Sequence, residues 1–443
     1  MSNRSLGRWL ALVVMCALVT IPALAESHVR IVRLSDVQGP VEVDRGTGQG
    51  YEKAFLNMPM VEGMKLAAKA DARAEVEFED GSTVRIAPNT RVDFTALALQ
   101  ESGARVSTLT LTQGMAYVQY SGKAKSDAFT VLFKDEKVRA DQAVHFRVDL
   151  EDAVAVLAVF NGDLKVEGPS GPVEVSKNKS VTFDLAAGNK FTLAKNIDEQ
   201  PFDAWDKQQS KYQMAYASRG SYRDYPYQYG VSDLNYYGTY SNVPGYGMMW
   251  QPYFAGANWS PFADGAWMFY PGAGYTWVSS YPWGWMPYRY GSWNFIPGNG
   301  WMWAPGGFGG WYNVPRVTNA PQRFNPPVAP SVGTATVTVG HPGISTGVPR
   351  RLVVQNGSAG LGVPRGAINN LNKVSNQVEK NGTATVRPSA PVRTSTMPAG
   401  GFGNAGSHMG TGNAGTRMNT GAAPVSPGRV GTGGGRPSAP SHH

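Results

Sequence analysis

The chain has 443 residues, one cysteine and a formal net charge of +8 at pH 7. That charge is uneven, because residues 26–200 carry 21 basic and 26 acidic side chains, whereas residues 318–443 carry 11 basic and one acidic. A basic folded surface of the kind that binds specific nucleic acids is therefore not indicated. The positive excess belongs to the C-terminal part of the chain.

Residues 1–25 have the features of a secretory signal peptide. Two arginines precede an apolar run that is too short to span a bilayer comfortably, and the run ends in Ala-Leu-Ala at residues 23–25. Cleavage there would remove Cys16 and leave a mature chain without thiols or disulfides. We expect export to the periplasm or cell surface of a bacterium, and an uncleaved membrane anchor is the alternative. No later stretch is long and apolar enough to be a transmembrane segment.

Short runs of alternating apolar and polar residues recur between residues 28 and 195, separated by turn signals such as Asp80-Gly81. Alternation places one face of a strand on a core and the other in solvent. The acidic residues of runs such as 74–78 are therefore expected on a solvated face. The pattern predicts about ten short strands in one all-β sandwich, barrel or coil.

Residues 198–217 change to a helical period. Phe202, Trp205, Tyr212 and Tyr216 fall close to one stripe, with Asp198 as the expected cap. A single helix is predicted to link the first domain to a second one.

Residues 222–312 are rich in Trp, Tyr and Gly, and ten of the chain's twelve Trp lie between Trp250 and Trp311. The pattern W-x-P-aromatic-x-x-G-x-W occurs at residues 259–267 and again at 285–293. Aromatic residues at these spacings share a strand face or face each other across a glycine turn. We therefore predict a second, small β module of stacked hairpins, called the aromatic module below.

Residues 315–443 consist mainly of Pro, Gly, Ser, Thr, Asn and Ala. Such a sequence cannot bury enough apolar area to offset backbone entropy, so a disordered basic tail is predicted. The exception is a helical face that is expected to order on a partner, formed by Ile368, Leu371, Val374 and Val378. The tail is expected either to contact anionic surface polymers, such as lipopolysaccharide or cell-wall polymers, or to be a soluble spacer.

The first domain carries the strand Gly39-Pro-Val-Glu-Val43, a central block around Asp80-Gly81-Ser82, and the hairpin sequence at residues 156–166. In these residues it resembles the FecR domain family, which implies an all-β extracytoplasmic domain. The best-known members of that family relay the state of a receptor to a sigma factor. They place a cytoplasmic helical domain and a membrane helix before the β domain, where this chain has a predicted cleavable signal.

The sequence from residue 202 to about residue 305 contains Tyr275-Thr-Trp277-Val and an aromatic block at residues 282–293. In these motifs it is similar to an uncharacterised exported family, rich in Trp, Tyr and Gly, that is often fused to FecR-like domains. The resemblance implies no known activity.

Groups for acid–base or metal chemistry are scarce. His145 is the one histidine inside a predicted domain and away from its edge, and its strand position suggests an exposed or hydrogen-bonded side chain. Residues 250–311 contain a single acidic residue, Asp264, although glycosidases need two carboxylates. We therefore predict no catalytic residues, no metal and no cofactor, and a protein that is not an enzyme.

The Trp cluster has two interpretations. It could be a ligand-binding surface whose rings stack on sugar faces while an arginine supplies a polar contact. It could also be a core, because the window lacks Leu and each buried Trp or Tyr removes about 150–250 Å² from water. The two interpretations are compatible if most Trp lie inside and two or three are exposed. The candidate binding residues are Trp259, Trp267, Trp277, Trp283, Trp285, Tyr288, Arg289 and Trp293.

Three functions are compatible with these features. The first is a non-enzymatic envelope protein that acts as a binding or scaffold module for an envelope protein or a cell-wall or surface glycan. The alternative is a FecR-type extracytoplasmic signalling regulator. The third is a carbohydrate-active enzyme built on the aromatic module.

Overall fold

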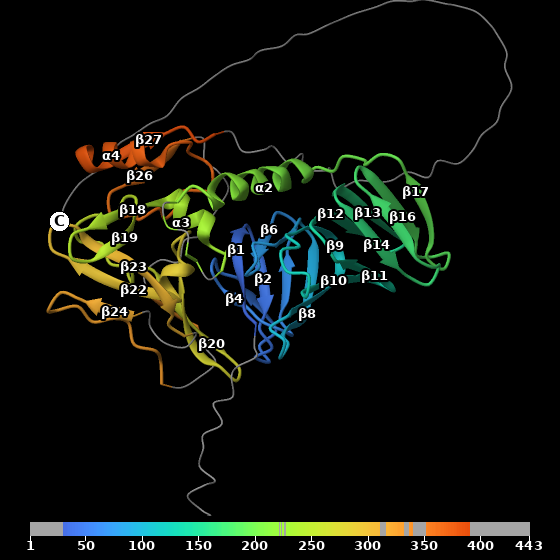
Figure 1. Ribbon diagram of the computed structural model, residues 1–443, viewed down its shortest axis with the longest axis horizontal. Coiled ribbons are helices and arrows are strands. Elements are labelled where there is room, and N and C mark those ends of the chain that lie inside the picture. Colours follow the sequence, from blue (N-terminus) through green and yellow to red (C-terminus); the bar gives the residue numbers. More distant parts are fainter. Residues whose placement is uncertain are drawn as a thin grey trace, which may run out of the picture. The chain divides into compact units, whose positions relative to one another are not determined.

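The computed structural model describes residues 30–220, 222, 224–225, 227–310, 316–331, 336–339 and 351–389 (Figure 1). The predicted signal peptide and residues 390–443 of the predicted tail lie outside the described residues. By internal contacts the chain divides into residues 1–396 and 397–443, and every described residue belongs to the first unit. Strands dominate this unit, which confirms the all-β prediction.

The first domain contains seventeen connected strands. This exceeds the number predicted, because very short strands such as β3 and β4 leave no alternating signature. The strands are β1 (Val32–Gln38), β2 (Val41–Asp44), β3 (Tyr51–Lys53), β4 (Pro59–Met60), β5 (Lys65–Ala68), β6 (Arg73–Glu77), β7 (Thr83–Ile86), β8 (Thr90–Leu99), β9 (Arg105–Tyr120), β10 (Ala128–Phe133), β11 (Glu136–Ala140), β12 (Val144–Leu150), β13 (Val154–Asn161), β14 (Asp163–Glu167), β15 (Val173–Ser176), β16 (Lys179–Asp184) and β17 (Lys190–Ala194).

These strands pair into two sheets that share β9. Sheet A runs β3-β2-β5-β8-β9-β10-β11-β14-β15. Sheet B runs β4-β1-β6-β7-β9-β12-β13-β16-β17. Apolar side chains from both sheets, such as Leu66 and Phe146, form one continuous core. Alternation leaves the opposite, outer face of sheet B to polar and charged side chains.

Strand β9 changes sheets at Gly114. Its first part pairs with β8 in sheet A, and its last residues pair with β7 and β12 in sheet B. Gly114 has φ +83°, and a Cβ there would lie 2.6 Å from the Asn89 carbonyl oxygen and 2.8 Å from the Thr90 Cα. Glycine is therefore needed for both conformation and space.

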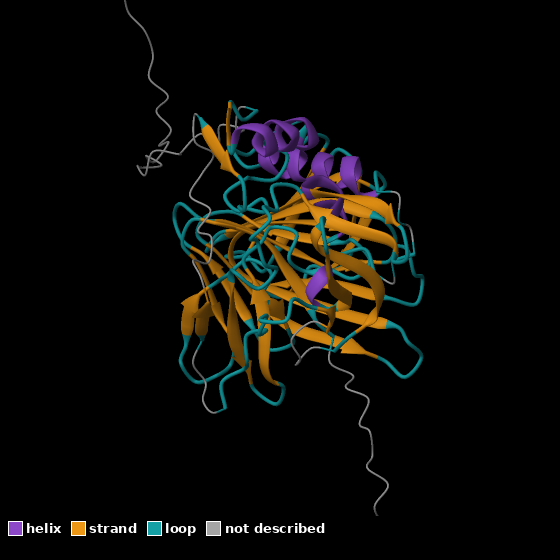
Figure 2. Cartoon of the chain, turned by 90° about the vertical axis from the view of Figure 1, so that its left-hand side faces the viewer, coloured by secondary structure: helices purple, strands orange, loops and turns teal. Residues whose placement is uncertain are grey.

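The linking helix is α2 (Asp203–Ala217), which begins five residues later than the sequence predicts. The start shifts because Pro201 disfavours the α conformation at Gln200; Phe202, and not Asp198, is the N-cap, and no side chain caps the helix. The buried face of α2 includes Trp205 and Tyr212, as expected, but also three polar residues, Asp206, Gln209 and Ser210. Figure 2 shows the longer helices gathered on one side of the strands.

The aromatic module is built from hairpins, as predicted. Its two sheets have the orders β18-β19-β23-β22-β24 and β21-β20-β25. Tryptophans face each other across the hairpins, Trp267 opposite Trp277 and Trp293 opposite Trp303. The elements are α3 (Val231–Tyr237), β18 (Gly238–Val243), β19 (Gly247–Pro252), β20 (Gly265–Tyr270), β21 (Gly274–Ser279), the 3₁₀ helix η1 (Met286–Tyr288), β22 (Tyr290–Ile296), β23 (Gly300–Phe308), β24 (Arg316–Asn319) and β25 (Val337–Val339).

Residues 351–389 fold into β26 (Leu352–Gln355), α4 (Leu371–Asn381) and β27 (Thr383–Val386). The prediction of disorder is therefore wrong for this part of the tail. The four apolar residues singled out on its helical face are all buried in the cluster that contains the tryptophans. The partner that orders this segment is thus the chain's own aromatic module. The apolar stripe was visible in the sequence, but the surface that covers it was not.

Replacing Gly114 tests the strand exchange between the sheets. Gly114→Ala adds both left-handed backbone strain and a clash, so we expect it to lower the free energy of unfolding by about 2–4 kcal/mol. Gly63→Ala is the matched control, because Gly63 has φ +82° but a Cβ added there would meet nothing within 4 Å. It should cost only about 1 kcal/mol in urea unfolding. Equal losses in the two variants would contradict a close-packed crossing at Gly114.

Candidate functional site at a buried ionic junction

The outer face of sheet B is charged but not solvated. Arg33, Glu75, Glu77, Arg85 and Arg147 point away from the core, yet each is at most 4% exposed. Helices α2 and α3 and the C-terminal segment supply the charged partners that meet this face. The prediction of a solvated acidic face is therefore wrong here. The reason is long-range, since 121 residues separate Arg85 from its partner Asp206.

Arg85 of β7 connects the sheet to helix α2. Its Nε lies 2.7 Å from Glu75 Oε2, and its Nη1 lies 2.7 Å from Asp206 Oδ1. Nη1 also donates to the Ser210 hydroxyl at 2.9 Å. The other Asp206 oxygen lies 2.8 Å from His145 Nε2, so this histidine is paired within the fold. The polar residues on the buried face of α2 are explained by this pairing.

Arg33 of β1 connects the sheet to the aromatic module. Its Nη1 lies 3.2 Å from Glu77 Oε2 and 2.6 Å from Asp233 Oδ2 of α3. Its Nη2 donates to the Pro282 carbonyl oxygen at 2.8 Å. The Gly230 N–H, at the start of α3, donates to Glu77 at 2.9 Å. Helix α3 is therefore fixed to sheet B through charge-assisted hydrogen bonds.

Arg365 of the C-terminal segment completes the set. Its Nη1 lies 2.6 Å from Glu75 Oε1, and its Nη2 lies 2.7 Å from Asp233 Oδ2. Three parts of the chain far apart in sequence thus share one buried network. We call it the ionic junction, and its members are Arg33, Glu75, Glu77, Arg85, Asp206, Asp233 and Arg365.

The carboxyl groups of the junction have different pKa values, because the balance of burial and neighbouring charges differs from one to the next. Burial would raise the pKa of Glu75, but Arg85 and Arg365 outweigh burial and lower this pKa to about 2. Burial raises the pKa of Glu77 to about 7, because Arg33 offsets it only in part and Asp233 adds repulsion. For Asp206 the hydrogen bond from His145 and the charge of Arg85 overcome burial and lower the pKa. Glu77 is therefore the junction member that titrates near neutral pH.

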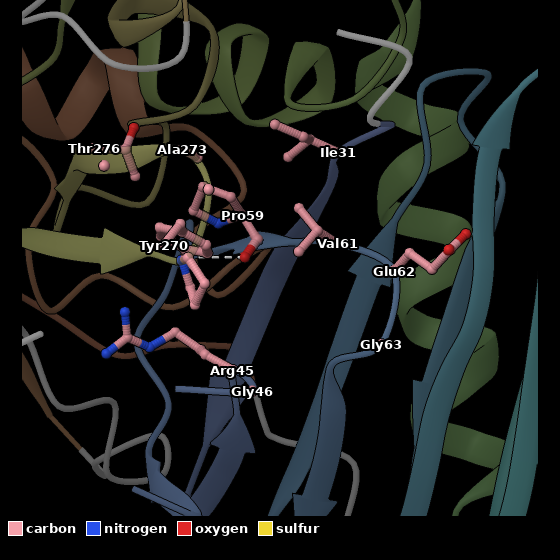
Figure 3. Close-up of a pocket in the computed structure, with 13 residues that line it drawn as sticks. Ile31, Arg45, Gly46, Pro59, Val61, Glu62, Gly63, Tyr270, Ala273 and Thr276 are labelled. Atoms are coloured by element: carbon pink, nitrogen blue, oxygen red, sulfur yellow. Dashed lines mark hydrogen bonds between the residues drawn. The ribbon is translucent and has the colours of Figure 1, made fainter. Parts of the chain in front are cut away.

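A cavity of about 380 Å³ lies where the first domain meets the β20–β21 hairpin (Figure 3). Pro59, Val61 and Ala273 give it apolar walls. Its polar groups are already engaged: Tyr270 donates to the Pro59 carbonyl oxygen at 2.9 Å, and Glu62 accepts from the Leu97 N–H at 2.9 Å. The cavity therefore suits a small apolar group better than a charged one.

The eight candidate binding residues do not form a surface. All are buried, and the most exposed of them, Trp259, is 6% accessible. Trp283 lies among the rings of Trp250, Trp259, Tyr281, Tyr288 and Trp293. Arg289 lies 5.3 Å from the ring of Trp285 and donates to the Trp277 carbonyl oxygen at 2.8 Å. In this conformation a sugar cannot stack on these rings, and of the two interpretations the geometry favours the core.

Comparison with known families defines the two folded parts. Residues 64–165 match the family described as FecR protein, and residues 231–326 match a family of unknown function, DUF6600. The chain therefore contains a FecR domain followed by a domain of that second family, which confirms both sequence resemblances. No curated protein matches the chain.

Two crystal structures of a candidate anti-sigma factor from Parabacteroides distasonis ATCC 8503 are similar to part of the chain. The structure at 1.65 Å resolution has 18% sequence identity and a TM-score of 0.27, and the match covers 32% of this chain and 63% of that chain. The structure at 2.50 Å has 16% identity and the same TM-score, 0.27, and covers 41% of this chain and 94% of that chain.

Neither a metal site nor a membrane-spanning helix is found in the described part of the chain. Among these residues, no three or more His, Cys, Asp or Glu side chains are grouped as a metal ion would require. None of the described helices has the length and apolar character needed to cross a membrane.

Sequence reasoning did not find the ionic junction. Its members come from β1, β6, β7, α2, α3 and residues 351–389, and no local pattern predicts that these elements meet. One signal was present: Asp206 and Ser210 interrupt the aromatic stripe of the predicted linking helix, between Trp205 and Tyr212. Polar residues beside an apolar stripe are also usual in a solvent-exposed amphipathic helix, so this signal did not point to a buried polar face.

Glu77 gives the junction a testable pH dependence. Its pKa in the fold, about 7, lies above the ordinary value of 4.5, so the folded protein holds this proton more tightly than the unfolded chain. The contribution is fully present below the unfolded pKa and is lost as the pH rises through the folded one. Acidification from about pH 8 to about pH 5 should therefore stabilise the protein through Glu77 by about 2 kcal/mol.

Glu77→Gln should remove this part of the pH dependence, measured as urea unfolding at several pH values. Glu167→Gln is the control, because that side chain is 54% exposed and pairs with Lys165 at the surface. It should leave the curve unchanged. Parallel pH curves for the wild type and Glu77→Gln would rule out a role for Glu77 in this window.

Proposed function

We propose that this chain is a non-enzymatic, exported FecR-type regulatory protein in which the FecR domain and the aromatic module respond to a partner as one unit. The ionic junction carries the proposal. Because Arg33, Glu75 and Arg85 are paired with residues of other segments, the aromatic module cannot shift without moving buried charges of the FecR domain. Separating such a pair costs about 3–5 kcal/mol, which is enough to couple two sites.

A non-catalytic role is supported by how the titratable groups are used. Glu75 is held by two guanidinium groups, and Asp206 is held by Arg85 and His145. Groups committed to structural pairs in this way are poorly placed to exchange protons with a substrate. The FecR resemblance supports a regulatory role, since the best-known members of that family relay a receptor's state to a sigma factor. The predicted signal peptide supports action outside the cytoplasm.

Transcript measurements in the source bacterium test the regulatory role. Loss of the protein should change a restricted set of transcripts, and Arg85→Met should change the same set, because it leaves Glu75 and Asp206 without a shared cation. Arg139→Ala is the control, since Arg139 forms an exposed ion pair with Asp141. Protein levels are compared by immunoblot. A deletion strain whose transcripts match the wild type under envelope stress would contradict the proposal.

An envelope-binding or scaffold role is the second candidate. It is favoured by the charge of residues 318–443, with 11 basic side chains and one acidic. Retention on isolated cell-wall material, weakened by salt, is the expected behaviour. The comparison should use a chain truncated after residue 389, because residues 351–389 belong to the folded unit. This truncation removes four of the 11 basic side chains, Arg393, Arg417, Arg429 and Arg436, so it should weaken retention. If neither form is retained, this role is excluded. Retention without any transcript change would favour it over regulation.

A further inference from the structure

The segment between β26 and α4 is held mainly through its backbone. The Trp283 indole N–H donates to the Ala359 carbonyl oxygen at 2.7 Å, and the Tyr237 hydroxyl donates to the Val363 carbonyl oxygen at 2.7 Å. The Tyr236 hydroxyl donates to the Ile368 carbonyl oxygen and accepts from the Ile368 N–H, both at 3.0 Å. Side chains of the aromatic module thus form hydrogen bonds with the backbone of a turn-rich peptide, as a peptide-binding groove does.

Arg365 anchors this peptide at the ionic junction. Its two terminal nitrogens meet carboxylates from different elements, Glu75 of β6 and Asp233 of α3. Its guanidinium carbon also lies 5.6 Å from the centre of the Tyr212 ring. Two carboxylates and an aromatic face together form an arginine pocket that suits the planar, forked guanidinium better than an ammonium group.

The peptide is close-fitting as well as charged. Ala359 is fully buried, and Val363 and Ile368 are nearly so. At Gly366, which has φ +65°, a Cβ would lie 3.3 Å from the Tyr212 ring. The site therefore fits a peptide in which an arginine is flanked by glycine and small apolar residues.

The C-terminal segment is discrete from the sheets that surround it. Strands β26 and β27 pair with each other, and among the described residues neither joins a sheet of the FecR domain or the aromatic module. Its departure would break side-chain contacts and a few backbone bonds, such as those from Gly357 and Ala359 to the Phe254 carbonyl oxygen, but no sheet ladder. It would also remove the Arg365 guanidinium from Glu75 and Asp233, so the vacated site would favour a cation.

We propose that the ionic junction is a binding site for an arginine-bearing turn of a partner protein, and that residues 357–369 of this chain occupy it in cis. This inference deepens the proposed function, on which it rests, by naming the chemistry of the partner. Partner binding would displace the cis segment, and the partner's own apolar side chains would then cover the rings that Ala359, Val363 and Ile368 bury. Because the ionic junction couples the FecR domain to the aromatic module, the arrangement of these two parts would then differ according to which of the two peptides is bound.

Peptide exchange tests the site with purified protein. A protease recognition sequence is inserted within residues 340–350 of the full chain. The folded protein is then cut at this sequence, so that only non-covalent contacts hold the C-terminal piece. A fluorescent peptide of residues 351–389, which carries all the buried contacts of the segment, should exchange with that piece. A peptide carrying Arg365→Ala should bind at least about tenfold more weakly, and one carrying Arg365→Lys should fall between them.

If the cut protein does not stay folded, variants of the uncut chain can be used to measure peptide binding instead. Full-length Arg365→Ala should bind the labelled peptide clearly better than the wild type does. Adding Asp233→Asn to that variant should reduce the preference for the arginine peptide over the alanine peptide, because only Glu75 then remains to pair with the guanidinium; folding is checked by circular dichroism.

Two results would overturn the proposal: no peptide binding by the cut protein and the Arg365→Ala variant, or equal binding of the arginine and alanine peptides. Neither result depends on the transcript measurement. Failure of the transcript test alone would leave the peptide site standing, and failure of peptide exchange alone would leave a regulatory role standing.

Discussion

The fold depends on buried guanidinium–carboxylate pairs on the outer face of sheet B. A face with Arg33, Glu75, Glu77 and Arg85 at its centre would ordinarily be solvated. Burying it is tolerable only because each charge meets an opposite charge at hydrogen-bond distance. The partners come from α2, α3 and residues 351–389, so these segments take the place of solvent. The pairs add a directional constraint to the apolar packing of Trp205 and Tyr212, because Arg85 and Arg365 must each meet their carboxylates at hydrogen-bond distance.

The aromatic module complements this face with a different kind of packing. Its tryptophans pack against one another in edge-to-face and stacked pairs, and several indole and phenol groups donate to backbone carbonyls of residues 359–368. The aromatic cluster therefore acts as a core that holds a peptide, instead of a platform open to solvent. A module with little Leu, Val or Ile can fold in this way because each ring removes a large area from water.

Local patterns in the sequence predicted the kinds of element well. Alternation, turn signals and the repeated W-x-P motif indicated the all-β class and the hairpins, because strand periodicity depends on neighbouring residues. What they could not predict was which face is covered. For that reason Glu75 and Glu77 were wrongly expected in solvent, residues 351–389 were wrongly expected to be disordered, and the choice between surface and core stayed open for Trp283. Burial there depends on contacts between segments far apart in the chain, such as Arg365 with Glu75, 290 residues away.

The most direct test of the shared junction is whether two spectroscopic signals, one from each folded part, report the same urea unfolding transition. Residues 28–195 contain no Trp, so tryptophan fluorescence reports on α2 and the aromatic module, whereas far-ultraviolet circular dichroism reports largely on the strands of the FecR domain. If the ionic junction joins the two parts into one cooperative unit, the two urea curves should superimpose for the wild type and separate for Arg85→Met. Two clearly separated midpoints in the wild type would contradict that coupling.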